Sequence, residues 1–367
     1  LKITNMHMVE IAKTISYDDK LIIMDKPTSS ITDKEVKHLF RLINDLRDKG
    51  VAIIYITHKM DEVFKIADEV TVLRDGEYIG TDFVENLTSD DIITMMVGRE
   101  LKDIFSKEES EITDVILSAK NLSYKSTDPL KTDIKDVSFE IRRGEVLGVS
   151  GLIGAGRSEL MELIFGINKP DTGEIFIHDE KVEIKTPQDA IRHGLALVPE
   201  DRHKTGLFLP LSVKDNLIMG DVNQFANNSF LIDSKVKDYS QAQRERLNIK
   251  TPSLKQLIKN LSGGNQQKVV IGRWLMTNPE ILILDEPTRG IDVGAKQEIH
   301  KIISELAQEG KAIIMISSEM PEILGASDRI MVMHEGKKMG EFIREEATQE
   351  KIMHLATGNK KENIENN

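Results

Sequence analysis

The sequence predicts an α/β fold around a mainly parallel sheet, and three observations lead to that expectation. Residues 281–284 and 312–316 are short continuous apolar runs, which are typical of parallel strands covered on both faces. Residues 297–309 have a helical pattern and lie between these two runs. The apolar run 146–150 leads into the glycine-rich stretch 151–158, and apolar residues at helical spacing follow. Strand, glycine loop and helix in this order are the context that a phosphate-binding loop requires.

Composition fits a globular protein of two ordinary domains. The chain has 367 residues, of which 40% are hydrophobic, enough for real cores. Its 49 basic and 61 acidic residues leave a net charge of −12, which argues against a nucleic-acid partner. It has no cysteine, which excludes disulfides and cysteine metal sites. Because no apolar stretch approaches the roughly 18 residues of a spanning helix, we expect membrane contact only through a partner.

The chain also contains a duplication. Displacing the sequence by 260 residues aligns its beginning with its end without a gap. The second copy begins near Val115, well before its own Leu261, so the first copy is expected to lack a comparable length at its front. The aligned pairs include Leu1 with Leu261, Asp25 with Asp285, Gly50 with Gly310, Asp68 with Asp328, Gly76 with Gly336, and Gly98 with Gly358.

Four segments are therefore expected. Residues 1–101 would form the C-terminal part of a first domain, and the charge-rich residues 102–113 would form a linker. Residues 114–358 would form a complete second domain, in which the polar stretch 212–259 makes a helical subdomain. The tail 359–367 has almost nothing to bury and is expected to be disordered.

The glycine-rich stretch is the first candidate site. It follows the phosphate-loop frame G-x-x-x-x-G-K-[ST], with Arg157 in the lysine position. Glycines let backbone N–H groups approach a phosphate at the start of a helix. Arg157 would contact the phosphates, and Ser158 would ligate Mg²⁺. The alternative is a turn that merely packs a helix on a strand. The predicted nucleotide-binding residues here are Gly151, Leu152, Ile153, Gly154, Ala155, Gly156, Arg157 and Ser158.

An acidic pair ends the apolar run 281–284. Asp285 and Glu286 would lie at the carboxyl edge of the sheet, where ligands bind. Asp285 suits the Mg²⁺ shell, and Glu286 suits the general base or water positioner for attack on a γ-phosphate. The alternative is an aspartate that caps a helix before Pro287.

A second anion-binding pattern opens a helix expected over 265–276. Its hydroxyl and free N–H groups would sit at a positive helix end. One domain rarely needs two phosphate cradles, so we expect this one to grip a γ-phosphate that a facing domain holds. An ordinary N-capped helix is the alternative. The residues assigned to this contact are Leu261, Ser262, Gly263, Gly264 and Gln266.

Two further residues are weaker candidates. Tyr124 lies upstream of the phosphate loop and could stack on adenine, although a core or surface tyrosine fits equally well. Glu200 could sense the γ-phosphate or its Mg²⁺, and a solvated loop glutamate is the alternative.

Together these motifs resemble the ATPase subunits of ABC importers, over essentially residues 1–358. The runs 261–268 (LSGGNQQK) and 284–292 (LDEPTRGID) follow the phosphate loop in that family's order. The closest resemblance is to the branch with two fused nucleotide-binding domains that serves monosaccharide uptake, of the galactose/methylgalactoside or ribose type. That branch commonly carries arginine in its second phosphate loop, as Arg157 does here, and Ser-Ser-Glu-Met in place of a histidine motif, as at 317–320.

The resemblance implies a P-loop NTPase fold of the ABC nucleotide-binding type, with a RecA-like core and a helical subdomain. It implies ATP and Mg²⁺ as cofactors, transmembrane permease subunits and a separate sugar-binding protein as partners, and a peripheral place on the cytoplasmic face of the membrane. ATP binding and hydrolysis would close and reopen a pair of domains. It also implies a D-loop at Gly290, Ile291 and Asp292, and switch positions at His58 and Ser318.

The first copy departs from the family pattern. In the 260-residue register, Lys2 and Thr4 replace the signature serine and second glycine, and Lys26 stands in the catalytic glutamate position. A protonated lysine cannot act as that base, because its usual pKa lies far above neutral. We therefore expect this chain alone to hydrolyse ATP poorly. The alternatives are a catalytically impaired, nucleotide-binding regulatory subunit and an ABC ATPase without a transport role.

Overall fold

The computed structural model describes the chain as two compact units, one before residue 98 and one after residue 106, and each is described by itself. No helix within the described ranges is both long and apolar enough to cross a membrane. The described residues are 20–25, 27–28, 33–57, 60–74, 76–97, 107–129, 131–227 and 230–359.

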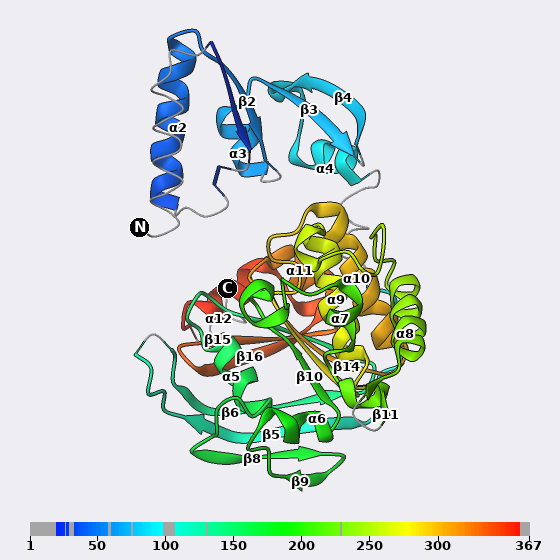
Figure 1. Ribbon diagram of the computed structural model, residues 1–367. Coiled ribbons are helices and arrows are strands. Elements are labelled where there is room, and N and C mark those ends of the chain that lie inside the picture. Colours follow the sequence, from blue (N-terminus) through cyan, green and yellow to red (C-terminus); the bar gives the residue numbers. More distant parts are fainter. Residues whose placement is uncertain are drawn as a thin grey trace. The chain divides into compact units, whose positions relative to one another are not determined.

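A six-stranded sheet forms the centre of the second unit (Figure 1). Its strands are parallel except for the last, which is antiparallel to its neighbour. The strand predictions at 146–150, 281–284 and 312–316 are confirmed, and all of these residues are buried. The strand order is β10 (Leu195–Val198), β13 (Ile281–Asp285), β14 (Ala312–Ile316), β7 (Val146–Ser150), β15 (Arg329–His334) and β16 (Lys337–Ile343).

A second, antiparallel sheet covers one side of this core, and sequence analysis did not predict it. Its order is β6 (Ile134–Arg142), β5 (Val115–Tyr124), β8 (Thr172–Ile177) and β9 (Glu180–Val182). Apolar side chains of both sheets share one cluster with α5 (Arg157–Ile164), which places the phosphate-loop helix within this layer.

Helices cover the other side of the central sheet. The expected helix over 297–309 is confirmed as part of α10 (Val293–Gln308). The polar stretch 212–259 contains mainly helices, among them α7 (Val213–Ile218) and α8 (Asp233–Arg246), as predicted. One buried cluster joins α7, α9 (Gly263–Leu275), α10, α11 (Met320–Ala326) and α12 (Gln349–Ala356) to strands of the sheet.

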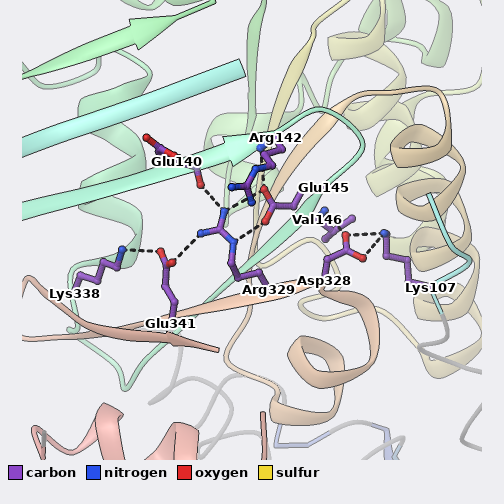
Figure 2. A network of polar contacts seen from close by, with 9 residues as sticks. All are labelled: Lys107, Glu140, Arg142, Glu145, Val146, Asp328, Arg329, Lys338 and Glu341. Carbon is purple, nitrogen blue, oxygen red and sulfur yellow. Dashed lines mark hydrogen bonds and ion pairs between the residues drawn. The ribbon is translucent and has the colours of Figure 1, made fainter. Parts of the chain in front are cut away.

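A network of ion pairs fixes the start of the second unit (Figure 2). Lys107, whose side chain is only 2% exposed, pairs at 2.6 Å with Asp328, which also accepts a hydrogen bond from the N–H of Val146. Arg329 pairs with the buried Glu145 at 2.7 Å and with Glu341 at 2.8 Å. The part of the expected linker from residue 107 onward is therefore attached to this unit.

The described part of the first unit contains two pairs of strands. β1 (Leu21–Asp25) and β2 (Ala52–Ile56) are parallel, and β3 (Glu69–Arg74) and β4 (Glu77–Phe83) are antiparallel. Each of these strands has the bounds of a strand in the second unit displaced by 260 residues, namely β13, β14, β15 and β16. Three helices within the described residues accompany them: α2 (Asp33–Asp48), α3 (Met60–Ile66) and α4 (Ser89–Val97).

Candidate nucleotide site

The predicted phosphate loop joins β7 to α5, in the expected strand, loop and helix order. Gly154 and Gly156 have φ angles of 80° and 91°, a region that favours glycine. A Cβ on Gly154 would meet nothing within 4 Å, so the loop is open on that side. A Cβ on Gly151 would instead come within 2.5 Å of the carbonyl oxygen of Met333. Glycine is therefore needed at positions 154 and 156 for the backbone conformation, and at position 151 for close packing against Met333.

Asp285 ends β13 and is only 6% exposed. Burial raises the pKa of this carboxyl to about 6, although a hydrogen bond with Ser158 opposes the shift. Its Oδ1 is buried and has no hydrogen-bond partner within the described ranges. Because the next helix begins only at Val293, Asp285 is not a helix cap. A buried carboxylate oxygen without a partner, beside a serine hydroxyl, fits the oxygen ligands that Mg²⁺ prefers.

Glu286 follows in a left-handed backbone conformation, with φ of 48°. Its side chain is 10% exposed, and burial raises its pKa. The hydroxyl of Ser318 donates to Oε2 of Glu286 at 3.1 Å. Arg157 lies on the other side, with its guanidinium 3.5 Å from Oε1 and donating to the carbonyl of Ser317 at 2.8 Å. The structure thus brings the predicted residues Arg157, Glu286 and Ser318 together.

These residues line a cavity of about 590 Å³. The cavity extends along the loop from Ile153 to Ser158 and also reaches Glu200, Gly290 and Glu286. Glu200 pairs with Arg289 at this cavity and is 44% exposed. Its role as a sensor of the γ-phosphate or Mg²⁺ stays a prediction. Tyr124 is not among the residues that line the cavity, and it packs against the apolar cluster between the two sheets.

Sequence analysis missed two cavity residues in the segment before β6. Thr132 donates from its hydroxyl to the carbonyl of Gly154 at 2.8 Å, and Lys131 pairs with Glu162 on α5 at 2.5 Å. Both therefore border the phosphate loop and add a cation to it. No local motif marks these residues, since only the packing of β6 brings them to the loop.

The signature run begins α9, whose first residue is Gly263. Ser262 precedes the helix but makes no capping bond with its side chain, and its hydroxyl accepts a hydrogen bond from Asn265 at 2.8 Å. Gln266 is buried and its amide is used internally, since its oxygen lies 2.8 Å from His203 and accepts from Arg202 at 3.3 Å. An ordinary capped helix therefore does not account for Ser262, and the side chain of Gln266 points inward.

The predicted D-loop is held from within the second unit. Arg202 donates to the carbonyls of Arg289 at 2.7 Å and Gly290 at 3.3 Å, and Ile291 is buried. Arg202 also starts a short π-helix, a feature often found at functional sites. His58, Lys26 and the residues before 20 lie outside the described ranges, so their predicted roles stay predictions.

Known proteins resemble this chain in sequence. The family model described as ABC transporter matches residues 134–289. A ribose/galactose/methyl galactoside import ATP-binding protein of Geobacillus kaustophilus is 61% identical over 98% of this chain and 70% of its own length. Proteins with the same description from Halalkalibacterium halodurans and Rhizobium meliloti are 56% and 53% identical over 98% and 97% of this chain, and 68% of their own lengths.

Solved structures of ATP-binding cassettes are also similar. A nucleotide-free ATP-binding cassette from an ABC transporter superposes with a TM-score of 0.57 at 23% identity, covering 66% of this chain and 96% of its own. The cbiO1 protein of Clostridium perfringens, part of an ABC transporter complex, has a TM-score of 0.55 at 27% identity and covers 66% of this chain and 93% of its own.

Proposed function

The chain belongs to the ABC transporter family of ribose/galactose/methyl galactoside import ATP-binding proteins, and we propose that its second unit holds ATP in the cavity beside Arg157. The carrying observation is that Arg157, Glu286 and Ser318, far apart in the sequence, meet at one cavity with the phosphate loop. The open side of the loop at Gly154 leaves room for phosphate oxygens against backbone N–H groups.

Magnesium would be held by Ser158 and Asp285, together with oxygens of the nucleotide. The buried Oδ1 of Asp285 supports this assignment because a metal ion would satisfy it. When bound, the ion would neutralise charge on the phosphates. Arg157 would contribute a second positive charge, delivered through a planar group rather than the point charge of lysine.

Glu286 would accept the proton of the attacking water. Its raised pKa brings it closer to the working pH of a general base, and the hydroxyl of Ser318 fixes one of its carboxylate oxygens. Ser318 thus replaces the usual histidine by donating to the base, without carrying charge. The signature residues from Leu261 to Gly264 would contact the γ-phosphate of a nucleotide held by another nucleotide-binding domain.

We propose that hydrolysis energises import of a monosaccharide of the galactose/methylgalactoside or ribose type, through permease subunits at the cytoplasmic face of the membrane. A separate sugar-binding protein would deliver the sugar to the permease. The test is uptake of labelled galactose and ribose by cells that lack the gene. Restoration by the wild-type gene but not by Glu286→Gln is expected, and unchanged uptake of both sugars after gene loss would contradict a role in their import.

The first unit is proposed to be part of a second nucleotide-binding domain. Ile23 and Ile54 are 61% and 48% exposed, whereas their counterparts Ile283 and Ile314 are fully buried between the two sheets. A cavity of about 370 Å³ is lined by residues of α2, β2 and the segment from Ile66 to Glu69. In the second unit, β7 lies between β14 and β15, which are the counterparts of β2 and β3. An apolar sheet face of this kind needs a covering layer.

Co-expression tests the proposal for the first unit. The partner fragment would be residues 114–280 of this chain, which contain β7 and the antiparallel sheet. We expect residues 1–101 to bind this fragment and to lose binding of a hydrophobic dye. Failure to associate, with both fragments folded by circular dichroism, would contradict the proposal.

The chain by itself is proposed to turn over ATP slowly, because Lys26 replaces a catalytic glutamate in the first copy. Magnesium-dependent turnover at rates typical of transport ATPases would contradict this part alone.

A further inference from the structure

Glu322 on α11 is fully buried and lies outside the predicted site. One of its carboxylate oxygens accepts a hydrogen bond from the hydroxyl of Thr288 at 2.8 Å and lies 2.8 Å from Nε2 of His300. The other accepts a hydrogen bond from the hydroxyl of Ser317. Burial by itself would raise the pKa of Glu322, but the contacts with His300, Ser317 and Thr288 hold it below its ordinary value. The carboxylate is therefore charged and surrounded by donors.

The partners of Glu322 flank the reacting groups. Thr288 is two residues beyond Glu286 on the loop after β13, and Ser317 directly precedes Ser318 on the loop after β14. The carbonyl of Ser317 also accepts a hydrogen bond from Arg157. One buried carboxylate thus ties together the two loops that carry the base and its orienting hydroxyl.

We propose that Glu322 is a positioning residue for ATP hydrolysis, which holds Glu286 and Ser318 at hydrogen-bond distance. This inference rests on the proposed hydrolysis at Glu286. The carboxylate of Glu322 reaches the cavity by way of Ser317 and Thr288, so it acts on the base indirectly. Burying a carboxylate costs free energy unless it is paired with hydrogen-bond donors or a cation. If α11 only had to pack against the core, an apolar side chain would serve at this position without that cost.

In the first unit a buried carboxylate also accepts hydrogen bonds from two loop hydroxyls, and one of its other partners differs. Its buried Glu62 accepts hydrogen bonds from Thr28 at 2.6 Å and from Thr57 at 3.1 Å. These three residues are the counterparts of Glu322, Thr288 and Ser317 in the 260-residue register. In the first unit the hydroxyl of Tyr55 supplies a further donor at 2.8 Å. The buried carboxylate and the two loop hydroxyls that donate to it are therefore present in both units, although the residues around them differ.

The test compares Glu322→Gln with Glu145→Gln. Glu145 is an equally suitable buried carboxylate, 2% exposed and paired with Arg329, but it lies in the network of Figure 2 away from the cavity. Phosphate release would give kcat and KM, and hydrogen exchange would report on the amides of residues 288–290 and 317–319. We expect Glu322→Gln to lower kcat by about tenfold or more with KM within about twofold, and to speed exchange in both loops.

The control separates positioning from general stability. Glu145→Gln should lower the unfolding temperature without changing kcat or exchange in the two loops. The proposal is overturned if Glu322→Gln leaves both readouts unchanged, or if Glu145→Gln changes them equally. If the wild-type chain releases no phosphate, the proposed hydrolysis fails separately, and loop exchange alone then decides whether Glu322 holds these loops.

Discussion

Replacing Arg157 by alanine is expected to weaken binding of Mg²⁺ and ATP by about 2- to 30-fold. The guanidinium is only 11% exposed and stands at the first position of α5, directly beside the phosphate loop. No other loop residue from Gly151 to Ser158 carries a positive charge. Loss of this charge should therefore directly weaken the binding of the phosphates.

The magnitude follows from the contacts of Arg157. A hydrogen bond to a charged group contributes about 1.5–3 kcal/mol. Part of this is offset, by about 1 kcal/mol, because the guanidinium already donates to the carbonyl of Ser317 and lies 3.5 Å from Glu286. The net loss is about 0.5–2 kcal/mol, and each 1.4 kcal/mol is a factor of ten in affinity.

Isothermal titration with a slowly hydrolysed ATP analogue and Mg²⁺ measures this effect. Arg246→Ala is the matched control, since Arg246 is exposed and pairs with Glu309 away from the cavity. Its affinity should equal that of the wild type. Equal affinities for Arg157→Ala and the wild type would refute the assignment of Arg157 to the phosphates.

Three further outcomes are expected. Ser158→Ala should abolish the gain in ATP affinity that Mg²⁺ gives the wild type, as measured by titration with and without the ion. Lys107→Ala should lower the unfolding temperature by roughly 5–10 °C, because it leaves the buried side of Asp328 without its cation, as measured by calorimetry. Glu341→Gln should cost about 1 kcal/mol at pH 7, and this cost should shrink as pH falls below 4.5, as measured by denaturant unfolding. Although burial would raise it, the pKa of Glu341 is held below 4.5 by Lys338 and Arg329, so its contribution is present above that pH and is lost as pH falls through the folded pKa.

Each of these outcomes has a result that would count against it. A preserved Mg²⁺ effect in Ser158→Ala would remove that hydroxyl from the metal shell. An unchanged unfolding temperature in Lys107→Ala would mean that the segment after residue 106 is not attached through this pair. A stability difference for Glu341→Gln that does not shrink as pH falls below 4.5 would point to lost packing rather than lost charge.

The parts of the site that sequence analysis predicted are those fixed by local patterns. The β7 strand, its glycine loop and α5 are contiguous, so the apolar run and the glycine spacing were sufficient. Asp285 and Glu286 follow a fully buried strand, and a continuous apolar run of that length is typical of a parallel strand covered on both faces. Their arrangement around Arg157 follows from strand order, since β14 lies between β13 and β7.

The parts that were missed depend on contacts between distant segments. The antiparallel sheet pairs β5 with β8 across more than 45 residues. In β6 and β8 exposed or half-exposed residues separate the buried ones, so no long continuous apolar run marks these two strands. Lys131 and Thr132 reach the phosphate loop only because β6 packs there. The charge-rich composition around Lys107 predicted a linker, whereas an ion pair with a residue 221 positions away buries that side chain.

Phosphate release by Glu286→Gln tests most directly whether the cavity beside Arg157 is where ATP is hydrolysed. Under single-turnover conditions with Mg²⁺, the wild-type chain should release phosphate slowly, and Glu286→Gln should be slower by about 10²-fold or more with unchanged nucleotide affinity. Equal rates of phosphate release from the two proteins would contradict the account.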